Sequence, residues 1–149
     1  MPRSSRSFLF PDVNVWLALT FDAHEHHAPA DCWLSALDLD SRLCFCRVTQ
    51  MSFLRLLTTE AVMGRDLALS QGEAWQTYDR WLENDRISFV GEPAGIESQF
   101  RALSRHNRPA PKDWADAYLA AFASAEGLTL VTFDQAFRGR TQNLQLLQV

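Results

Sequence analysis

The sequence predicts a three-layer α/β domain with a central, mostly parallel sheet. Short apolar segments typical of strands alternate with longer segments whose apolar residues recur at helical spacing. Two of the strand segments, Ser7–Phe10 and Leu128–Val131, read as almost continuous apolar runs. Such runs are typical of strands that are covered by helices on both faces, as in a parallel sheet. No internal repeat is present, and the length predicts a single domain over residues 1–149.

The elements of the first half follow from these two spacings. Pro11 ends the first strand, because proline cannot donate to the next rung of a sheet. Thr49 is a residue type that caps helices. In chain order we expect a strand at Ser7–Phe10, helices at Asn14–Thr20 and His24–Asp38, a strand at Leu43–Cys46 and a helix at Thr49–Thr59.

The second half carries clearer helix boundaries. Ser70 followed by Glu73 forms a capping box, and Gly127 marks the end of a helix over Asp113–Ala125. Aromatic residues at helical spacing, Trp75, Tyr78 and Trp81, are expected in the core or in a dimer interface. The other expected elements are strands at Ile87–Val90, Leu128–Thr132 and Leu144–Leu147, a helix at Ile96–Ser104 and a loop at Arg105–Lys112.

Composition and charge exclude several classes of protein. Fourteen Lys and Arg against eighteen Asp and Glu give a net charge of −4, so bulk positive charge is not what would hold a nucleic acid. Local patches and a bridging cation would have to do so. The sequence contains no GxxxxGK[ST], GxGxxG or GxSxG pattern. The usual features for ATP hydrolysis, dinucleotide redox chemistry and serine hydrolysis are therefore missing.

Cysteine usage and the N-terminal segment indicate where the protein resides. The three cysteines are odd in number and lack zinc-site spacing, which predicts reduced thiols in a cytosol. The apolar stretch from Ser7 to Phe21 is interrupted by Pro11, Asp12 and Asn14. It is too short and too polar for a secretory signal or a bilayer span. We therefore expect a cytoplasmic protein with no membrane association.

Aspartates occupy the positions where a parallel α/β sheet places its functional crevice, beyond the carboxyl ends of the strands. Asp12 follows the first strand, and Asp134 follows the late strand at Leu128–Thr132. Asp116 lies at the start of the helix that comes just before this late strand. If the two strands are neighbours, these carboxylates converge. Converging like charges need a cation, and Mg²⁺ or Mn²⁺ would both neutralise them and activate a water at a phosphodiester.

A structural interpretation stands beside the functional one. An aspartate after a strand is often only a turn or cap residue. The segment Asp113-Trp114-Ala115-Asp116 is similar to an N-cap followed by an acid at the third helical position, which stabilises a helix start. For Asp113 the capping interpretation is the preferred one, whereas for Asp12, Asp116 and Asp134 position alone leaves the two interpretations balanced.

An ordered set of motifs resembles the PIN-domain ribonucleases, specifically the toxins of VapBC-type toxin–antitoxin modules. Single motifs of this set are weak, but together they run in the family's order from about Phe8 to Phe137. The matching segments are Phe8–Leu19 with its D-x-N, His27–Trp33 as H-x-x-A-x-x-W, Thr49–Arg55 as T-Q-x-x-F-x-R, Asp116–Ala123 as D-A-x-L-A-A, and Leu130–Phe137 with its T-x-D-x-x-F.

The resemblance implies an activity, partners and site residues. It implies a metal-dependent endoribonuclease acting on RNA, often a structured RNA such as tRNA. It also implies a cognate antitoxin that occludes the acidic site, and a toxin homodimer. Asp12, Asp116 and Asp134 match the family's acidic positions, which assigns them as the catalytic and metal-binding residues.

The chain departs from the common family pattern at Ser52. Many PIN domains place a Glu in this middle helix, although a branch with T-Q-x-x-F-L-R also lacks it. Asp113 is a hypothetical replacement for the missing charge, because residues three apart on a helix share a face. The alternative is a catalytically inactive PIN-like scaffold that binds RNA or a protein partner. A more distant alternative is a flavodoxin-like signalling domain that accepts phosphate on Asp12.

Several further residues are candidates for supporting roles. Asn14 either holds Asp12 or a phosphate oxygen or caps the following helix, and Thr132 either orients Asp134 or is an ordinary strand residue. Arg55 is expected to pair with a local acid rather than with RNA. The histidines at positions 24, 26 and 27 are expected to be solvated or capping residues and not metal ligands. The clusters Arg105–Arg108 and Arg138–Arg140 flank the acids and either guide RNA phosphates or belong to solvated loops.

Overall fold

The computed structural model describes residues 7–149 and contains one five-stranded sheet. Its strands lie in the order β3-β2-β1-β4-β5, and all four strand pairs are parallel. This confirms the predicted parallel sheet, with β1 and β4 as central neighbours. The strands are β1 (Phe8–Pro11), β2 (Arg42–Phe45), β3 (Ile87–Phe89), β4 (Thr129–Thr132) and β5 (Leu144–Leu146).

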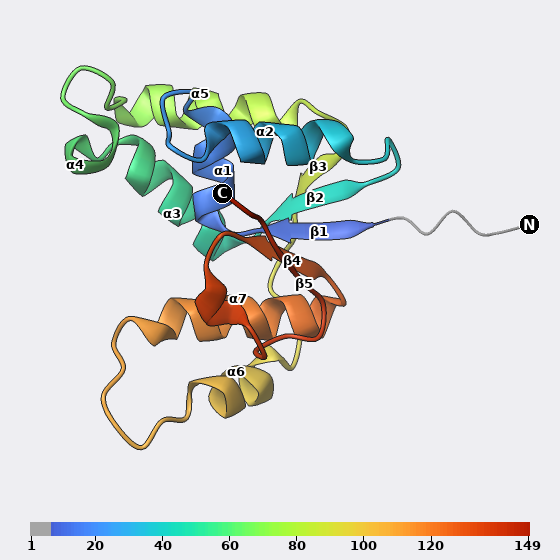
Figure 1. The fold of residues 1–149 in the computed structure, drawn as a ribbon. Helices are drawn as coiled ribbons and strands as arrows, with labels where there is room; N and C mark the ends of the chain where they lie inside the picture. The colour runs from blue at the N-terminus through green and yellow to red at the C-terminus, as the bar shows by residue number, and fades with distance from the viewer. Residues whose placement is uncertain (1–6) are drawn as a thin grey trace, which may run out of the picture.

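Helices cover both faces of the sheet, as the three-layer prediction requires (Figure 1). On one face lie α1 (Val13–Thr20), α2 (His27–Ala36), α3 (Arg47–Leu57) and α5 (Gln71–Leu82), with the short α4 (Glu60–Met63) at their edge. On the other face lie α6 (Ile96–Ser104) and α7 (Asp113–Glu126). In the part of the chain that the structure describes, no helix combines the length and hydrophobicity needed to cross a bilayer.

Two hydrophobic cores form because successive strand residues point to opposite faces of the sheet. Leu9 of β1 and Val131 of β4 belong to the core beneath α1, α2, α3 and α5. Phe10 and Leu130, their chain neighbours, belong to the core beneath α6 and α7. All four side chains are at most 4% exposed. The continuous apolar runs of the sequence thus reflect burial on both faces.

The helix starts differ from the sequence-based expectations at three places. Asp12, not Asn14, caps α1. Helix α3 begins at Arg47 rather than after Thr49, with Cys46 at its cap position. The Thr49 hydroxyl accepts the Cys46 backbone N–H at 2.9 Å and so satisfies this end from inside the helix. Residues 24–26, expected as the start of a helix, form a turn before α2.

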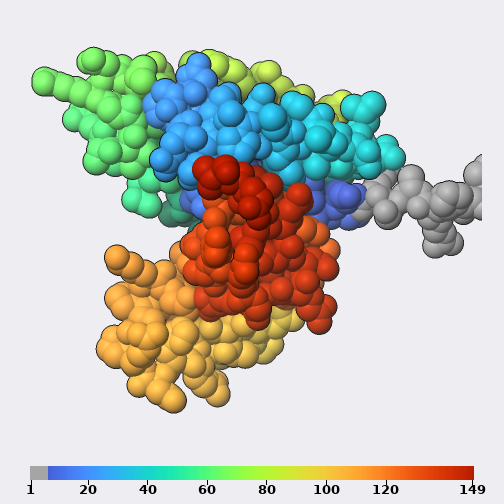
Figure 2. Space-filling view, viewed as in Figure 1, coloured from blue at the N-terminus to red at the C-terminus, as the bar shows by residue number. Residues whose placement is uncertain are grey.

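The aromatic residues expected to pack at helical spacing are buried to different degrees. Trp33 and Tyr78 are less than 10% exposed and Trp81 is partly buried, whereas Trp75 is 47% exposed on α5. Sequence spacing did not predict α4 or the 3₁₀ turn η1 (Gln135–Phe137). In the space-filling view the C-terminal segment lies between the helices of the two layers (Figure 2).

Candidate active site

The carboxyl ends of β1 and β4 lie side by side. The two strands pair with Pro11 opposite Val131, and the backbone N–H of Asp12 donates to the Val131 carbonyl at 2.8 Å. Asp12 and Asp134 each follow one of these strands, so the sheet brings them to the same edge. The sequence-based expectation that their strands are neighbours is confirmed.

Asp12 is a buried carboxylate that is held at both oxygens. Only 7% of the surface of Asp12 is exposed. Oδ1 accepts the Val13 backbone N–H at 2.7 Å, and Oδ2 accepts the Thr132 hydroxyl at 2.9 Å. Burial raises the pKa of Asp12, the bonds from Thr132 and Val13 lower it, and the nearby charge of Asp134 raises it. Asp12 therefore caps α1 and faces another acid at the same time.

Thr132 connects the two strand ends. Its hydroxyl donates to Asp12 and accepts the Asp134 backbone N–H at 3.0 Å. The Asn14 side-chain amide lies 3.5 Å from the same hydroxyl, at the limit of a hydrogen bond. The Asn14 Oδ1 atom is buried and has no hydrogen-bond partner. An acceptor oxygen with nothing to accept is uncommon in a folded protein and here lies beside the acids.

Asp134 is the most accessible of the three acids. It caps the 3₁₀ turn, because its Oδ1 accepts the Ala136 backbone N–H at 2.9 Å. Within residues 7–149 its second oxygen accepts no hydrogen bond. One carboxylate oxygen therefore fixes the turn, while the other remains available to a ligand.

Asp116 comes to the same region from the first turn of α7. Burial is the largest cause that raises the pKa of Asp116, followed by the charges of Asp12, Asp134 and Asp113, and the resulting value is about 6. The positive charge of Arg140 lowers it. A carboxylate responds this strongly to other acids only when they are close. The three assigned aspartates therefore form one electrostatically coupled group.

Asp113 does not join that group as a free carboxylate, and this corrects two sequence-based interpretations. It is the first residue of α7 and not its cap, which is Lys112. Arg140 binds both of its oxygens, with Nη2 3.1 Å from Oδ2, and His106 Nε2 lies 2.6 Å from Oδ2. These contacts, Arg140 first, lower the pKa of Asp113 to about 2. Its charge is already compensated, so it does not replace the missing Glu.

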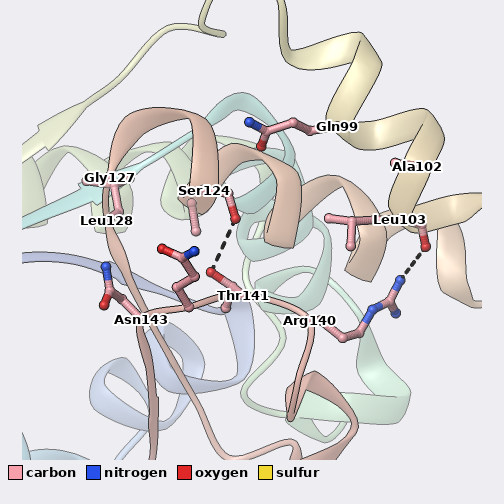
Figure 3. A pocket seen from close by; sticks show the side chains of 11 residues that line it. Gln99, Ala102, Leu103, Ser124, Gly127, Leu128, Arg140, Thr141 and Asn143 are labelled. Carbon is pink, nitrogen blue, oxygen red and sulfur yellow. Dashed lines mark hydrogen bonds between the residues drawn. The ribbon is translucent and has the colours of Figure 1, made fainter.

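Arg140 holds this corner of the molecule together. Besides Asp113 on α7, its guanidinium donates to the Leu103 carbonyl on α6 at 2.9 Å (Figure 3). It also lines an adjacent hollow together with Gln99, Ser124 and Thr141. The segment after η1 is thus fastened to the start of α7, which carries Asp116. Arg140, considered from sequence as an RNA contact, acts instead as an anchor.

The remaining candidates from the sequence form no ion pair with the three aspartates in the described chain. Ser52 is half-buried on α3, and its side chain takes part in no hydrogen bond of the described chain. Arg55 is exposed, and no acid of residues 7–149 lies within ion-pair distance of it, so its expected pairing does not form. His27 Nδ1 lies 2.7 Å from the Ala18 carbonyl and His24 Nδ1 accepts a backbone N–H at 3.0 Å. Two of the three histidines thus serve local structure.

The coupled acids fit a hard divalent cation by their chemistry. Carboxylate and amide oxygens are the ligands that Mg²⁺ prefers, and the site offers both types, including the unpartnered Oδ1 of Asn14. Among the described residues, no three His, Cys, Asp or Glu side chains lie so that they could hold a metal ion by themselves. Mg²⁺ typically takes one or two protein carboxylates and completes its shell with water or phosphate oxygens.

The fold and the site together define a class of protein. A parallel α/β sheet that gathers coupled aspartates at its carboxyl edge is suited to binding a divalent cation and to metal-assisted phosphodiester chemistry, as in nucleases. The family model described as "PIN domain" matches residues 9–141. The chain belongs to the PIN-domain family.

Individual relatives agree with this assignment. The chain is 47% identical over 132 residues to Ribonuclease VapC41 of Mycobacterium tuberculosis, covering 87% of this chain and 90% of that protein. It is 30% identical over 133 residues to Ribonuclease VapC39 of the same species, covering 84% and 87%.

Two solved structures share the fold. VapBC2 from Rickettsia felis, bound to a DNA fragment from its promoter, superposes with a TM-score of 0.67 at 14% identity and covers 95% of this chain and 99% of that chain. Mycobacterium tuberculosis VapC20, described as a sarcin-ricin loop cleaving toxin, gives 0.63 at 19% identity and covers 87% and 92%.

Proposed function

We propose that this protein is a divalent-metal-dependent endoribonuclease and the toxin of a toxin–antitoxin module. The similarity to Ribonuclease VapC41 over most of both chains supports an RNA-cleaving activity. The observation that carries the proposal is the meeting of Asp12 and Asp134 at the paired carboxyl ends of β1 and β4, where the Thr132 hydroxyl bonds to both residues. Three neighbouring carboxylates repel one another, and a bound cation would remove this free-energy cost.

The acids would hold Mg²⁺ or Mn²⁺, with Asn14 Oδ1 as a further oxygen ligand, direct or through water. When bound, such an ion supplies charge neutralisation and an activated water for attack on phosphorus. The chain's own residues prepare the site. Thr132 fixes the orientation of Asp12 and the backbone before Asp134, and Arg140 fixes the start of α7 through Asp113. The acids are thus pre-positioned by neutral or compensated groups.

The proposed substrate is RNA, with structured RNAs such as tRNA as the first candidates. The proposed partners are a cognate antitoxin protein that covers the acidic site and a second copy of the chain. Solved relatives of the same fold include toxin–antitoxin complexes from Klebsiella pneumoniae and Rickettsia felis. The proposed location is the cytoplasm, where the three free cysteines would stay reduced. Sedimentation equilibrium of the purified chain tests the homodimer, which predicts twice the 17.0 kDa chain mass.

The activity is tested by incubating purified protein with total RNA and Mn²⁺, with and without EDTA, and sequencing the fragment ends. We expect discrete cleavage sites that EDTA abolishes. Asp12→Asn, Asp116→Asn and Asp134→Asn should each reduce cleavage by at least about 100-fold, because each removes charge from the ion's surroundings. Asp31→Asn, at an exposed position on α2, is the matched control and should cleave like the wild type.

Two outcomes would reject the proposal. Cleavage that survives both EDTA and Asp12→Asn would exclude the metal-dependent mechanism. Absence of cleavage together with absence of Mn²⁺ uptake in calorimetry would favour the inactive PIN-like scaffold, for which the Ser52 substitution is the motivating feature.

A further inference from the structure

The strongest feature outside the acidic site is an exposed tryptophan beside it. Trp114 is 60% exposed, although tryptophan is usually well buried. It is the second residue of α7, between Asp113 and Asp116. Its ring is held edge-on by Phe100 of α6, with centroids 6.2 Å apart and planes at 70°. One ring edge is therefore fixed, while much of the ring surface faces solvent.

The surroundings of Trp114 are basic in an acidic protein. From Arg101 to Lys112 the chain has four Lys or Arg residues and no Asp or Glu. Arg105, Arg108 and Lys112 are exposed. None of these three lies within ion-pair distance of an acid in the described chain. This segment therefore offers uncompensated positive charge against a net chain charge of −4.

Trp114 forms a wall shared by two hollows. One hollow is lined by Arg108, Pro109 and Pro111 from the loop before α7. The other is lined by Phe100, Arg101 and Arg105 from α6 and its end. Each hollow thus combines the indole with at least one arginine. Aromatic rings supply stacking surface for bases, and arginines supply phosphate contacts.

The same surface lacks what a protein partner needs. Trp114 is the single large apolar side chain classed as exposed between Ile96 and Glu126. Protein interfaces have a contiguous apolar centre, and one tryptophan surrounded by arginines does not provide it. A nucleobase needs only one ring face and a nearby charge for its phosphate.

The position of Trp114 ties it to the acids. Trp114 lies two positions before Asp116, which is about 3 Å along the helix axis and about 200° around it, so the two side chains leave the first turn of α7 on opposite sides. The carboxylate faces the sheet edge, while the indole faces α6. The loop before α7 is fastened by His106 to Asp113, and it projects on the side of the strand ends (Figure 1). An RNA strand with its phosphate at the acids would reach Trp114 by passing over the N-terminal end of α7.

We infer that Trp114 is a stacking platform for an unpaired base next to the cleaved phosphate, and that Arg105 and Arg108 bind the adjoining phosphates. This rests on the proposed function and adds a residue that recognises the substrate: a base must be unpaired to offer its face to the Trp114 ring. Trp114 thereby acts as a specificity-determining residue.

The test measures RNA binding in EDTA, where cleavage is absent. The probe is a fluorescein-labelled, unstructured twelve-nucleotide RNA followed by anisotropy, compared with the same strand annealed to its complement. We expect the wild type to prefer the single strand. Trp114→Ala should weaken its binding about 5- to 100-fold, whereas Trp114→Phe should retain most of it. Trp75→Ala is the matched control, because Trp75 is 47% exposed and held edge-on by Tyr78.

Base stacking is separated from a general structural effect by abasic nucleotides. An abasic substitution at one position should weaken wild-type binding and leave Trp114→Ala binding unchanged, as expected when both changes remove one contact. Arg105→Ala and Arg108→Ala should each reduce the dependence of log affinity on log salt. Thermal unfolding of every variant checks that the fold is retained.

Three results would overturn the inference: equal binding by the wild type and Trp114→Ala, equal losses in Trp114→Ala and Trp75→Ala, or no abasic position whose effect depends on Trp114. The first would assign the surface to a protein partner. The proposed nuclease activity is judged separately. If the protein binds RNA through Trp114 but does not cleave it, this inference stands and the nuclease activity is rejected. If Trp114→Ala cleaves RNA like the wild type, the activity stands and this inference is rejected.

Discussion

The hydroxyl of Thr132 joins the two halves of the acidic site: it donates to Asp12 Oδ2 at 2.9 Å and accepts the backbone N–H of Asp134 at 3.0 Å. Thr132 is fully buried, and its bond to Asp12 is buried as well. That bond joins residues 120 positions apart in the chain. One small side chain thus sets the relative position of the acids that follow β1 and β4.

Thr132→Val should therefore damage both stability and activity. Valine has nearly the same shape, but it leaves the buried Asp12 oxygen unpaired, which costs about 1–3 kcal/mol, and it removes the acceptor of the Asp134 N–H. Loss of the Thr132 bond also raises the pKa of Asp12 further, because this bond is a cause that lowers it. Urea unfolding and cleavage assays measure the two effects. Thr132→Ser keeps the hydroxyl, and a serine variant as impaired as valine would contradict this account.

The pKa of Asp116 predicts an unusual pH dependence for the metal-free protein. The folded-state value is raised from 3.8 to about 6, so the folded chain binds this proton more tightly than the unfolded chain. The contribution of Asp116 to the unfolding free energy therefore falls as pH rises from about 4 to about 6 and is constant above that. In EDTA, the wild type should lose stability relative to Asp116→Asn across this window.

Mn²⁺ should reverse the effect, because the ion binds the ionised acid. We expect Mn²⁺ to raise the unfolding temperature of the wild type more at pH 7 than at pH 5, and to do so far less for Asp116→Asn. Thermal unfolding at the two pH values, with Mn²⁺ or EDTA, measures this. A stabilisation by Mn²⁺ that is equal at both pH values would show that the ion binds elsewhere.

The pairing of Asp113 with Arg140 predicts the opposite pH dependence. The pKa of Asp113 is lowered from 3.8 to about 2, so its contribution to stability is present above about pH 4 and is lost as pH falls toward 2. Both side chains are about one-fifth exposed. Arg140→Gln should destabilise the protein by about 2 kcal/mol at pH 7, and the difference from the wild type should shrink toward pH 2. An undiminished difference would mean that Arg140 stabilises through its bond to the Leu103 carbonyl or through packing, and not through Asp113.

The sequence predicted the sheet and the meeting of three acids because both depend on local signals. Apolar runs with a period of two or of 3.6 residues locate strands and helices, and the carboxyl ends of adjacent parallel strands must share an edge. Asp12 and Asp134 follow such runs directly. Their convergence needed only the neighbour relation of β1 and β4, which the structure provides.

The features that sequence reasoning missed depend on contacts between distant segments. Asp113 is paired with an arginine 27 positions later, and no local pattern distinguishes that pairing from a free carboxylate. Cys46 is an unusual helix cap, so α3 was expected to start later than it does. Trp114 left one usable signal: it lies off the apolar stripe of α7, whose buried positions begin at Ala117. A large aromatic residue in a polar first turn indicates a role in binding.

Asn14 offers the clearest separation of function from stability. Its Oδ1 atom is buried without a partner, and its amide nitrogen makes only a 3.5 Å contact with Thr132. Removing a group that is already unsatisfied forfeits little free energy, so Asn14→Ala should change the unfolding free energy by less than about 1 kcal/mol. If the oxygen serves a bound ion, the same variant should bind Mn²⁺ about tenfold more weakly and cleave RNA correspondingly slowly.

Urea unfolding in EDTA and Mn²⁺ titration by calorimetry measure the two quantities on one preparation. Asn14→Asp keeps an oxygen at the position and should retain Mn²⁺ binding. A destabilised Asn14→Ala variant with unchanged Mn²⁺ affinity would instead make Asn14 a structural residue of the α1 start.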